Sequence, residues 1–138
     1  MFGIPRPGAA AYRQLSVTSD ALAASPHQLV VMLFDGALDA VSTAQAQMTR
    51  QDTEGKGHAI TRAIEIIGSG LLASLDMQQG GDVAQNLASL YEYLIRELLL
   101  ANLSSDPQRL QHCASLLQEL RSSWMAIAHG SAPAKAAA

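Results

Sequence analysis

The chain is poor in charge, and in positive charge above all. Of its 138 residues 15% are charged, with 9 lysines and arginines against 12 aspartates and glutamates, and only Lys56 and Lys135 are lysines. So few cations cannot hold the phosphates of nucleic acid or the headgroups of anionic lipid. Apolar residues, at 49%, reach the top of the globular range. A chain of this composition buries nearly all its apolar surface or keeps some for a partner.

Cysteine and long apolar runs are also scarce. The single Cys113 excludes an internal disulfide and fits a reducing compartment. No stretch approaches about eighteen uninterrupted apolar residues, the length that a transmembrane helix requires. Residues 1–8, with Pro5 and Pro7, lack the apolar centre of a signal peptide. We therefore expect a single cytoplasmic domain that does not insert into a membrane.

Residues that build catalytic or metal sites do not occur in the required patterns. A di-iron bundle requires Glu-x-x-His pairs, and none of Glu65, Glu92, Glu97 and Glu119 has a histidine three residues later. The four histidines are far apart and near expected helix ends, which favours surface roles over a shared metal site. Cys113 lies between apolar helical neighbours and is expected to be a small buried hydrophobic residue. We expect no enzyme, no metal and no cofactor.

Two helices are expected in the first half of the chain. Ser25 followed by Pro26 is a strong helix start, and the apolar stripe that follows extends to about Met48. A second stripe, over residues 60–75, has the narrow spacing of helical bundles. The Gly-Ser-Gly at 68–70 interrupts it, and either weakens the helix or lets a neighbour approach closely.

Two more helices are expected in the second half. Gly80-Gly81 ends the second helix, and Asp82 is expected to cap the third, which is the most apolar. Its apolar residues cover much more than the one face that a bundle core occupies. Asp106-Pro107 repeats the cap-then-proline signal, and a fourth helix extends to Ile127. The apolar residues of the third helix include Leu90, Tyr91, Leu94, Ile95, Leu98 and Leu99.

Four helices joined by short links predict an all-α fold, an antiparallel up-down four-helix bundle over residues 25–128. Residues 1–24 are expected to form a flexible N-terminal arm with a short helical segment, because glycine and proline crowd its start. Residues 129–138 show no periodic pattern and are expected to be a disordered tail.

Short motifs follow one another in a fixed order along the chain. Tyr12 and Ala24-Ser25-Pro26 precede Met32-Leu33-Phe34-Asp35-Gly36-Ala37, and then come Ser74-Leu75-Asp76, Asn86-Leu87, Leu90-Tyr91, Ala101-Asn102 with Asp106, and Leu120-Arg121 with Trp124. In this order, over roughly residues 11–127, they resemble the motifs of the flagellin export chaperones of the FliS family.

The resemblance implies a cytoplasmic chaperone that binds the disordered C-terminal segment of flagellin in an apolar groove. It further implies that the chaperone prevents premature polymerisation, delivers flagellin to a component of the flagellar export gate, and exists as a monomer or weak homodimer. The residues expected to contact flagellin are Tyr12, Leu15, Leu33, Phe34, Gly36, Ala37, Asn86, Leu87, Leu90, Tyr91, Leu94 and Trp124.

Other interpretations remain open. The chain could be a chaperone for another secretion substrate, or a purely structural helical adaptor or dimer, while a metal- or ligand-binding bundle is disfavoured by the missing ligands. The N-terminal arm could cover the additional apolar surface of the third helix. Single motif residues also have simpler explanations, since Trp124 is typical of a core, Asn86 of a helix cap, and Arg121 of an ion pair with Asp76 or Glu119.

Overall fold

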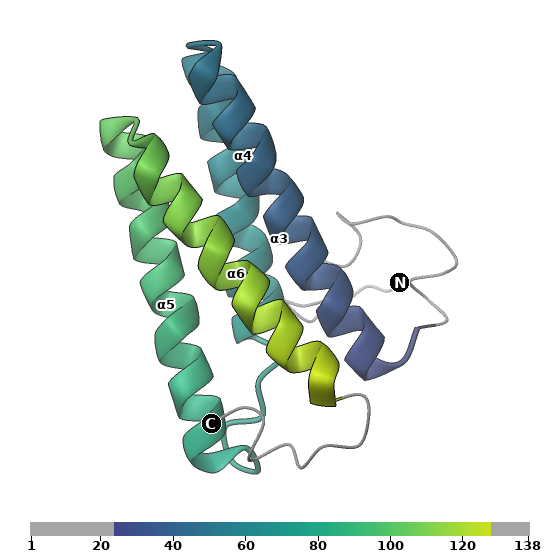
Figure 1. The fold of residues 1–138 in the computed structure, drawn as a ribbon. Helices are drawn as coiled ribbons and strands as arrows, with labels where there is room; N and C mark the ends of the chain where they lie inside the picture. The colour runs from purple at the N-terminus through teal and green to yellow at the C-terminus, as the bar shows by residue number, and fades with distance from the viewer. Residues whose placement is uncertain (1–23, 128–138) are drawn as a thin grey trace, which may run out of the picture.

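A computed structural model of the protein describes residues 24–127. The described chain forms α3 (Pro26–Thr49), α4 (Thr53–Glu65), the π-helical segment η1 (Ile66–Leu72), α5 (Gly81–Ser104) and α6 (Pro107–Ile127). Each helix runs back alongside the one before it (Figure 1). No strand occurs between residues 24 and 127, and the predicted all-α helical bundle is confirmed. The expected arm and tail lie outside the described residues.

The first helix begins where the sequence predicts. The Ser25 hydroxyl accepts a hydrogen bond from the Gln28 backbone N–H at 3.1 Å, and the Gln28 side chain accepts one from the Ser25 N–H at 3.0 Å. Pro26 fills the first helical position, where its missing N–H would have no helical partner. Such a capping box satisfies two otherwise unpaired donors. The helix then ends at Thr49, one residue beyond the predicted Met48.

The second helical stretch differs from the prediction. It begins earlier, at Thr53, because the Asp52 carboxylate accepts a hydrogen bond from the Gly55 N–H at 2.9 Å. At the Gly-Ser-Gly the helix neither stops nor continues as α-helix, and instead widens into η1. The residues on both sides of the junction, Glu65 and Ile66, keep ordinary right-handed helical angles, so the two helical forms are continuous.

The start of α5 also differs from the prediction. Its N-cap is Gly80, and Asp82 lies inside the first turn, where its negative charge faces the positive end of the helix. A Cβ at Gly80 would lie 2.6 Å from the Ala84 Cβ, so only glycine fits this turn. Asp106 caps α6 as predicted, because its carboxylate accepts hydrogen bonds from the N–H groups of Gln108 and Arg109.

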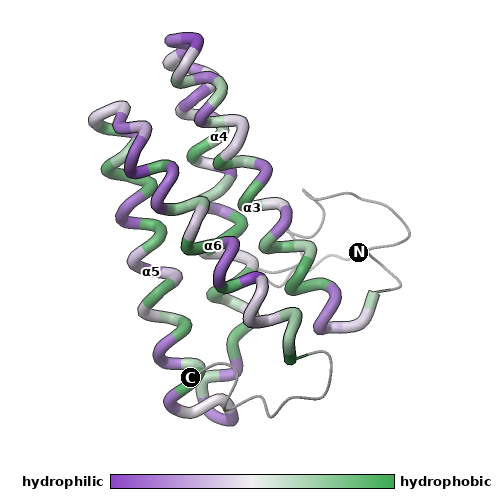
Figure 2. Tube along the Cα trace, in the orientation of Figure 1, coloured by the Kyte–Doolittle hydropathy of each residue, from purple (hydrophilic) through white to green (hydrophobic). Residues whose placement is uncertain are grey.

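One hydrophobic core runs through the bundle. Small residues, Ala37, Ala40 and Ala44 on α3 with Ala59 and Ala63 on α4, let these two helices lie close together. Figure 2 shows hydrophobic and hydrophilic residues interleaved along each helix. This pattern is typical of helices with one face in a core and the other in solvent. The largest fully buried side chains are Phe34, Leu33, Ile60, Ile66, Ile67, Leu71, Leu94, Leu98, Leu110, Leu117, Val41 and Cys113.

By length and composition alone, α3 could cross a membrane. The core helix of a soluble protein passes the same test, which makes this weak evidence. Burial accounts for part of the apolar character of α3, because Leu33, Phe34 and Val41 are at most 1% exposed and pack into the core.

Candidate functional site

Five of the residues expected to contact a partner lie in the core. Leu33, Phe34 and Ala37 of α3, with Tyr91 and Leu94 of α5, are at most 2% exposed. The rings of Phe34 and Tyr91 approach to 6.3 Å between centroids at an angle of 60°. Burial raises the pKa of the Tyr91 hydroxyl above its ordinary value. In this conformation these side chains join α3 to α5 inside the bundle, where a partner does not reach them.

The other expected contacts are distributed over the bundle. Gly36 is buried, Leu87 and Leu90 are half-buried on α5, and Asn86 is exposed and lies away from the helix start that it was expected to cap. Tyr12 and Leu15 lie outside the described residues. The structure thus brings the expected residues of α3 and α5 together, but chiefly in the core. Their part in partner binding stays a prediction.

Trp124 lies half-buried against the start of α3. Its indole Nε1–H donates to the carbonyl oxygen of His27 at 3.1 Å, and the His27 Nε2 lies 2.8 Å from the carbonyl oxygen of Trp124. The two rings stack with centroids 5.0 Å apart and 14° between their planes. This contact fixes the end of α6 to the beginning of α3 and is only partly a core contact.

Three leucines near the end of α5 are exposed to solvent. Leu99 is 53% exposed, Leu100 44% and Leu103 86%. They point away from the neighbouring core residues Leu98 and Ala101, which are fully buried. The run of leucines at 98–100 is the sequence signal, because three consecutive residues of a helix cannot all face one core. We call Leu99, Leu100 and Leu103 the leucine patch.

A buried lysine fixes the backbone beside the leucine patch. Lys56 is 4% exposed, and its ammonium donates to the carbonyl oxygen of Asn102 at 3.0 Å and to the Ser105 hydroxyl at 2.7 Å. Ser105 ends α5 in the left-handed conformation, with φ 48°. The Lys56 ammonium lies at the C-terminal end of α5, where the partial negative charge of the helix dipole stabilises a cation. Neither motifs nor spacing indicated this role for Lys56.

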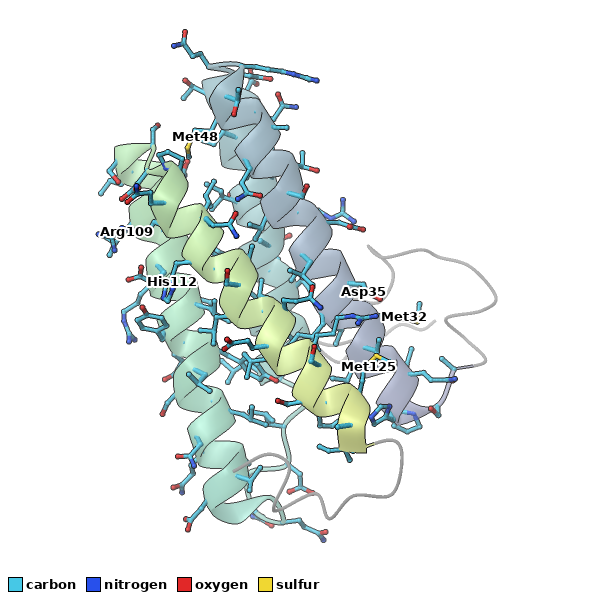
Figure 3. The ribbon with its side chains drawn as sticks, viewed as in Figure 1. Met32, Asp35, Met48, Arg109, His112 and Met125 are labelled. Atoms are coloured by element: carbon cyan, nitrogen blue, oxygen red, sulfur yellow. The ribbon has the colours of Figure 1, made fainter. Side chains whose placement is uncertain are left out.

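Polar side chains pair between neighbouring helices of the bundle. Arg109 and His112 project from α6 toward α5 (Figure 3), where Arg109 donates to both carboxylate oxygens of Glu97 at 3.1 Å and His112 lies 2.7 Å from the Tyr93 hydroxyl. On the α3 side, Arg121 pairs with Asp35 at 2.6 Å. The predicted pairing of Arg121 with Asp76 or Glu119 is therefore wrong.

An open depression of about 790 Å³ lies along α6, beside Leu38 of α3. Leu38 and Ala114 are its apolar residues, and the other side chains that line it are mainly neutral and polar. Among residues 24–127, no three His, Cys, Asp or Glu side chains gather closely enough to hold a metal ion. Burial, with a smaller contribution from Glu97, raises the pKa of the Cys113 thiol to about 12, which leaves it unreactive. This arrangement favours binding over catalysis.

Comparison with known proteins agrees with the motifs. The family model described as Flagellar protein FliS matches residues 8–131. The flagellar secretion chaperone FliS of Salmonella typhimurium is 46% identical over 120 residues, which cover 87% of this chain and 89% of that protein. FliS of Escherichia coli is 40% identical over 117 residues, which cover 85% of this chain and 86% of that protein. FliSB of Pseudomonas aeruginosa is 41% identical over 118 residues, which cover 86% of this chain and 93% of that protein. The chain therefore belongs to the FliS family of flagellar secretion chaperones, a family of chaperones and not of enzymes.

Proposed function

We propose that the protein is a cytoplasmic chaperone that binds the disordered C-terminal segment of flagellin. By covering that segment it prevents premature polymerisation, and it delivers flagellin to a component of the flagellar export gate. Membership of a family of flagellar secretion chaperones supports this role. The observation that carries it is the leucine patch, which leaves apolar side chains of α5 open to a partner.

The leucine patch fits a partner that folds as it binds. Leu99, Leu100 and Leu103 are spaced three and four residues apart on one helix, as in the contacts between packed helices. An amphipathic segment lying beside α5 would cover them. Ordering a disordered segment costs on the order of 2–5 kcal/mol, so about 1,000–3,000 Å² must be buried to offset it. Contacts beyond three leucines are therefore required, and Leu87 and Leu90 lie on the same helix.

Titration of the protein with an isolated flagellin C-terminal peptide tests this function. We expect one peptide per protein, a gain in helical circular dichroism, and a negative heat-capacity change because apolar surface is buried. Binding without any gain in helicity would contradict coupled folding. Absence of binding, together with enrichment of a different secreted protein in a pull-down from flagellated cells, would favour the alternative of a chaperone for another substrate.

A further inference from the structure

A cavity of about 370 Å³ lies at the end of the bundle where α5 finishes. The turn between α3 and α4 and the turn between α5 and α6 form its walls, and both turns lie at this end (Figure 1). Its lining is mainly polar, with the hydroxyl-bearing residues Thr49, Thr53 and Ser105. Asp52 and Lys56 supply the full charges of the lining. Pockets for small ligands occupy about 300–1,000 Å³, so this one, which we call the Lys56 cavity, has room for a small polar group.

Lys56 brings to this lining a positive charge that no carboxylate neutralises. Its side chain is 4% exposed, and its two acceptors, the Asn102 carbonyl oxygen and the Ser105 hydroxyl, are both neutral. No carboxylate among residues 24–127 forms an ion pair with its ammonium. The dipole of α5 supplies only about half an elementary charge of the opposite sign. Buried charges are normally paired, so the ammonium lacks the anionic partner that its burial requires.

The ammonium of Lys56 also has a donor to spare. A lysine ammonium carries three N–H donors, and the Asn102 carbonyl oxygen and the Ser105 hydroxyl occupy two of them. Lys56 and Ser105 line the cavity together, which leaves the third donor at its wall. The Asp52 carboxylate is already engaged, because it caps α4 and accepts from the Gly55 N–H at 2.9 Å. A carboxylate that enters the cavity therefore meets a free donor and an unpaired positive charge.

The Lys56 cavity lies directly beyond the leucine patch. Leu103, the most exposed leucine of the patch, lies in the chain between Asn102 and Ser105, which both accept hydrogen bonds from the ammonium. Ser105 is the C-cap of α5, about 9 Å along the helix axis from Leu99. An extended chain advances about 3.3 Å per residue. A segment that packs on the patch thus reaches the cavity within about two or three further residues.

We propose that the Lys56 cavity binds the C-terminal carboxylate of the flagellin segment. The ammonium donates its third N–H to a carboxylate oxygen, and this charge-assisted hydrogen bond gives Lys56 its anionic partner. Capture of a terminal carboxylate is a recurrent mode of peptide recognition, and a segment that ends its chain carries this group whatever its side chains are. The segment then runs parallel to α5, with its apolar residues on the leucine patch. The inference rests on the proposed function for the identity of the partner.

Two forms of the flagellin C-terminal peptide test the site on the unaltered protein. One ends in a free carboxylate and the other in an amide, which removes the terminal charge and keeps every side chain. We expect calorimetric titration to show that the amide binds at least tenfold more weakly. Equal affinity of the two peptides would overturn the proposal, because the terminal carboxylate would then contribute nothing to binding.

Lys56→Met should abolish the difference between the two peptides. The comparison is made within one variant, so a loss of stability affects both affinities equally and cancels. Gly57→Ala is the matched control, because it changes the next residue of α4 and nothing lies within 4 Å of the added Cβ. This control should keep the tenfold difference. A tenfold difference that persists in Lys56→Met would mean that the carboxylate binds elsewhere, and would overturn the proposal.

Asp52→Asn tests the charge of the cavity from the opposite side. The substitution removes the negative charge of the lining and keeps a side-chain cap on α4, since asparagine caps as well as aspartate. We expect tighter binding of the free-carboxylate peptide and unchanged binding of the amide. An equal change for both peptides would count against the proposal, because the effect would then not involve the terminal charge.

Side-chain NMR of the lysines covers the remaining outcomes. The chain has two lysines, Lys56 and Lys135, so their signals are readily told apart. If Lys56→Met does not fold, the Lys56 signal of the unaltered protein should shift with the free-carboxylate peptide and much less with the amide, and equal shifts would overturn the proposal. If neither peptide binds, the proposed function is contradicted and titration with acetate decides on the cavity. A saturable shift at Lys56 alone would support it, and no shift, or equal shifts at both lysines, would overturn it.

Discussion

His27 and Trp124 bind each other through two reciprocal hydrogen bonds and a ring stack, although 97 residues separate them. Because the Trp124 carbonyl oxygen can only accept, the His27 Nε2 carries a proton and donates, which fixes the tautomer of the neutral ring. The pair connects the first turn of α3 to the last turns of α6, next to the point where the described chain begins.

Loss of this pair should loosen one end of the bundle. Trp124→Leu removes the stack and the indole donor, and we expect it to lower the free energy of unfolding by about 2 kcal/mol. Met125→Leu, on the same turn, should have little effect, because Met125 is exposed. Urea denaturation of both variants measures the difference. Equal stability of the two would show that the contact contributes nothing.

The leucine patch and the core residues should respond oppositely to charge. Leu103→Asp places a carboxylate in water, so we expect unchanged thermal melting and weaker binding of the flagellin peptide. Tyr91→Asp buries an unpaired charge and should cost several kcal/mol, enough to unfold a domain of ordinary stability. Peptide titration and melting of both variants separate the two roles. A stable Tyr91→Asp variant, or full affinity in Leu103→Asp, would contradict this assignment.

The sequence predicted the parts of the fold that are set by local chemistry. Ser25-Pro26 and Asp106-Pro107 start helices because a capping side chain and a proline act within one turn. The form of η1 could not be predicted in this way, since glycines permit several backbone forms and contacts with α3 and α5 select among them. The N-cap at Gly80 was missed because the tight approach of Ala84 and Asp76, rather than a side-chain acceptor, determines that turn.

The candidate site was harder to predict than the fold. Apolar spacing placed Tyr91 and Leu94 on a common face, but spacing alone does not say whether a face meets the core or a partner. Burial of Lys56 depends on acceptors 46 and 49 residues later in the chain.

Alkaline pH should destabilise the protein, because the thiol of Cys113 and the hydroxyl of Tyr91 are buried and stay protonated in the folded chain. The pKa of Cys113 is raised from 9.0 to about 12, and that of Tyr91 is raised from 10.0. Above about pH 9 the unfolded chain loses the thiol proton while the folded chain keeps it, so stability falls as pH rises, by about 1.4 kcal/mol per pH unit for one group. Cys113→Ala should flatten this fall between about pH 9 and pH 10.5. Urea midpoints across that range measure it, and an identical slope in the variant would refute the assignment.

Lys56→Met should disturb the end of α5 more than the bundle as a whole. The substitution removes the donors to Asn102 and Ser105, and we expect a loss of about 1–2 kcal/mol, because these acceptors are partly open to water and recover some hydrogen bonding. Hydrogen exchange should accelerate at the amides of Ser105 and Asp106, which bond to the Ala101 oxygen. Ser104→Ala, which changes the neighbouring exposed residue and leaves both acceptors of Lys56 in place, is the control and should be nearly neutral. Unchanged exchange in Lys56→Met would show that the lysine does not fix this turn.

Removal of the N-terminal arm should reveal whether it covers the flagellin-binding surface. The arm contains Tyr12 and Leu15, which are too apolar to prefer water throughout and lie in a segment too short to form a stable helix alone. We expect the arm to fold over the binding surface of the free protein and to move aside for flagellin. A covered site lowers the apparent affinity in proportion to the fraction of open molecules. Deletion of residues 1–18 should therefore leave the affinity for the flagellin peptide equal or improved, and should increase the binding of dyes that report exposed apolar surface.

The alternative is that Tyr12 contacts flagellin directly, and the same deletion distinguishes the two. A contact would be lost with the arm, so a roughly tenfold weaker affinity, or about 1.4 kcal/mol, in a variant with unchanged thermal melting would establish a direct contact and exclude the cover. Tyr12→Ala in the full chain is the matched control, because it removes the ring and keeps the rest of the arm. If the arm is a cover held by Tyr12, this single substitution should raise the apparent affinity, and if Tyr12 is a contact it should lower it.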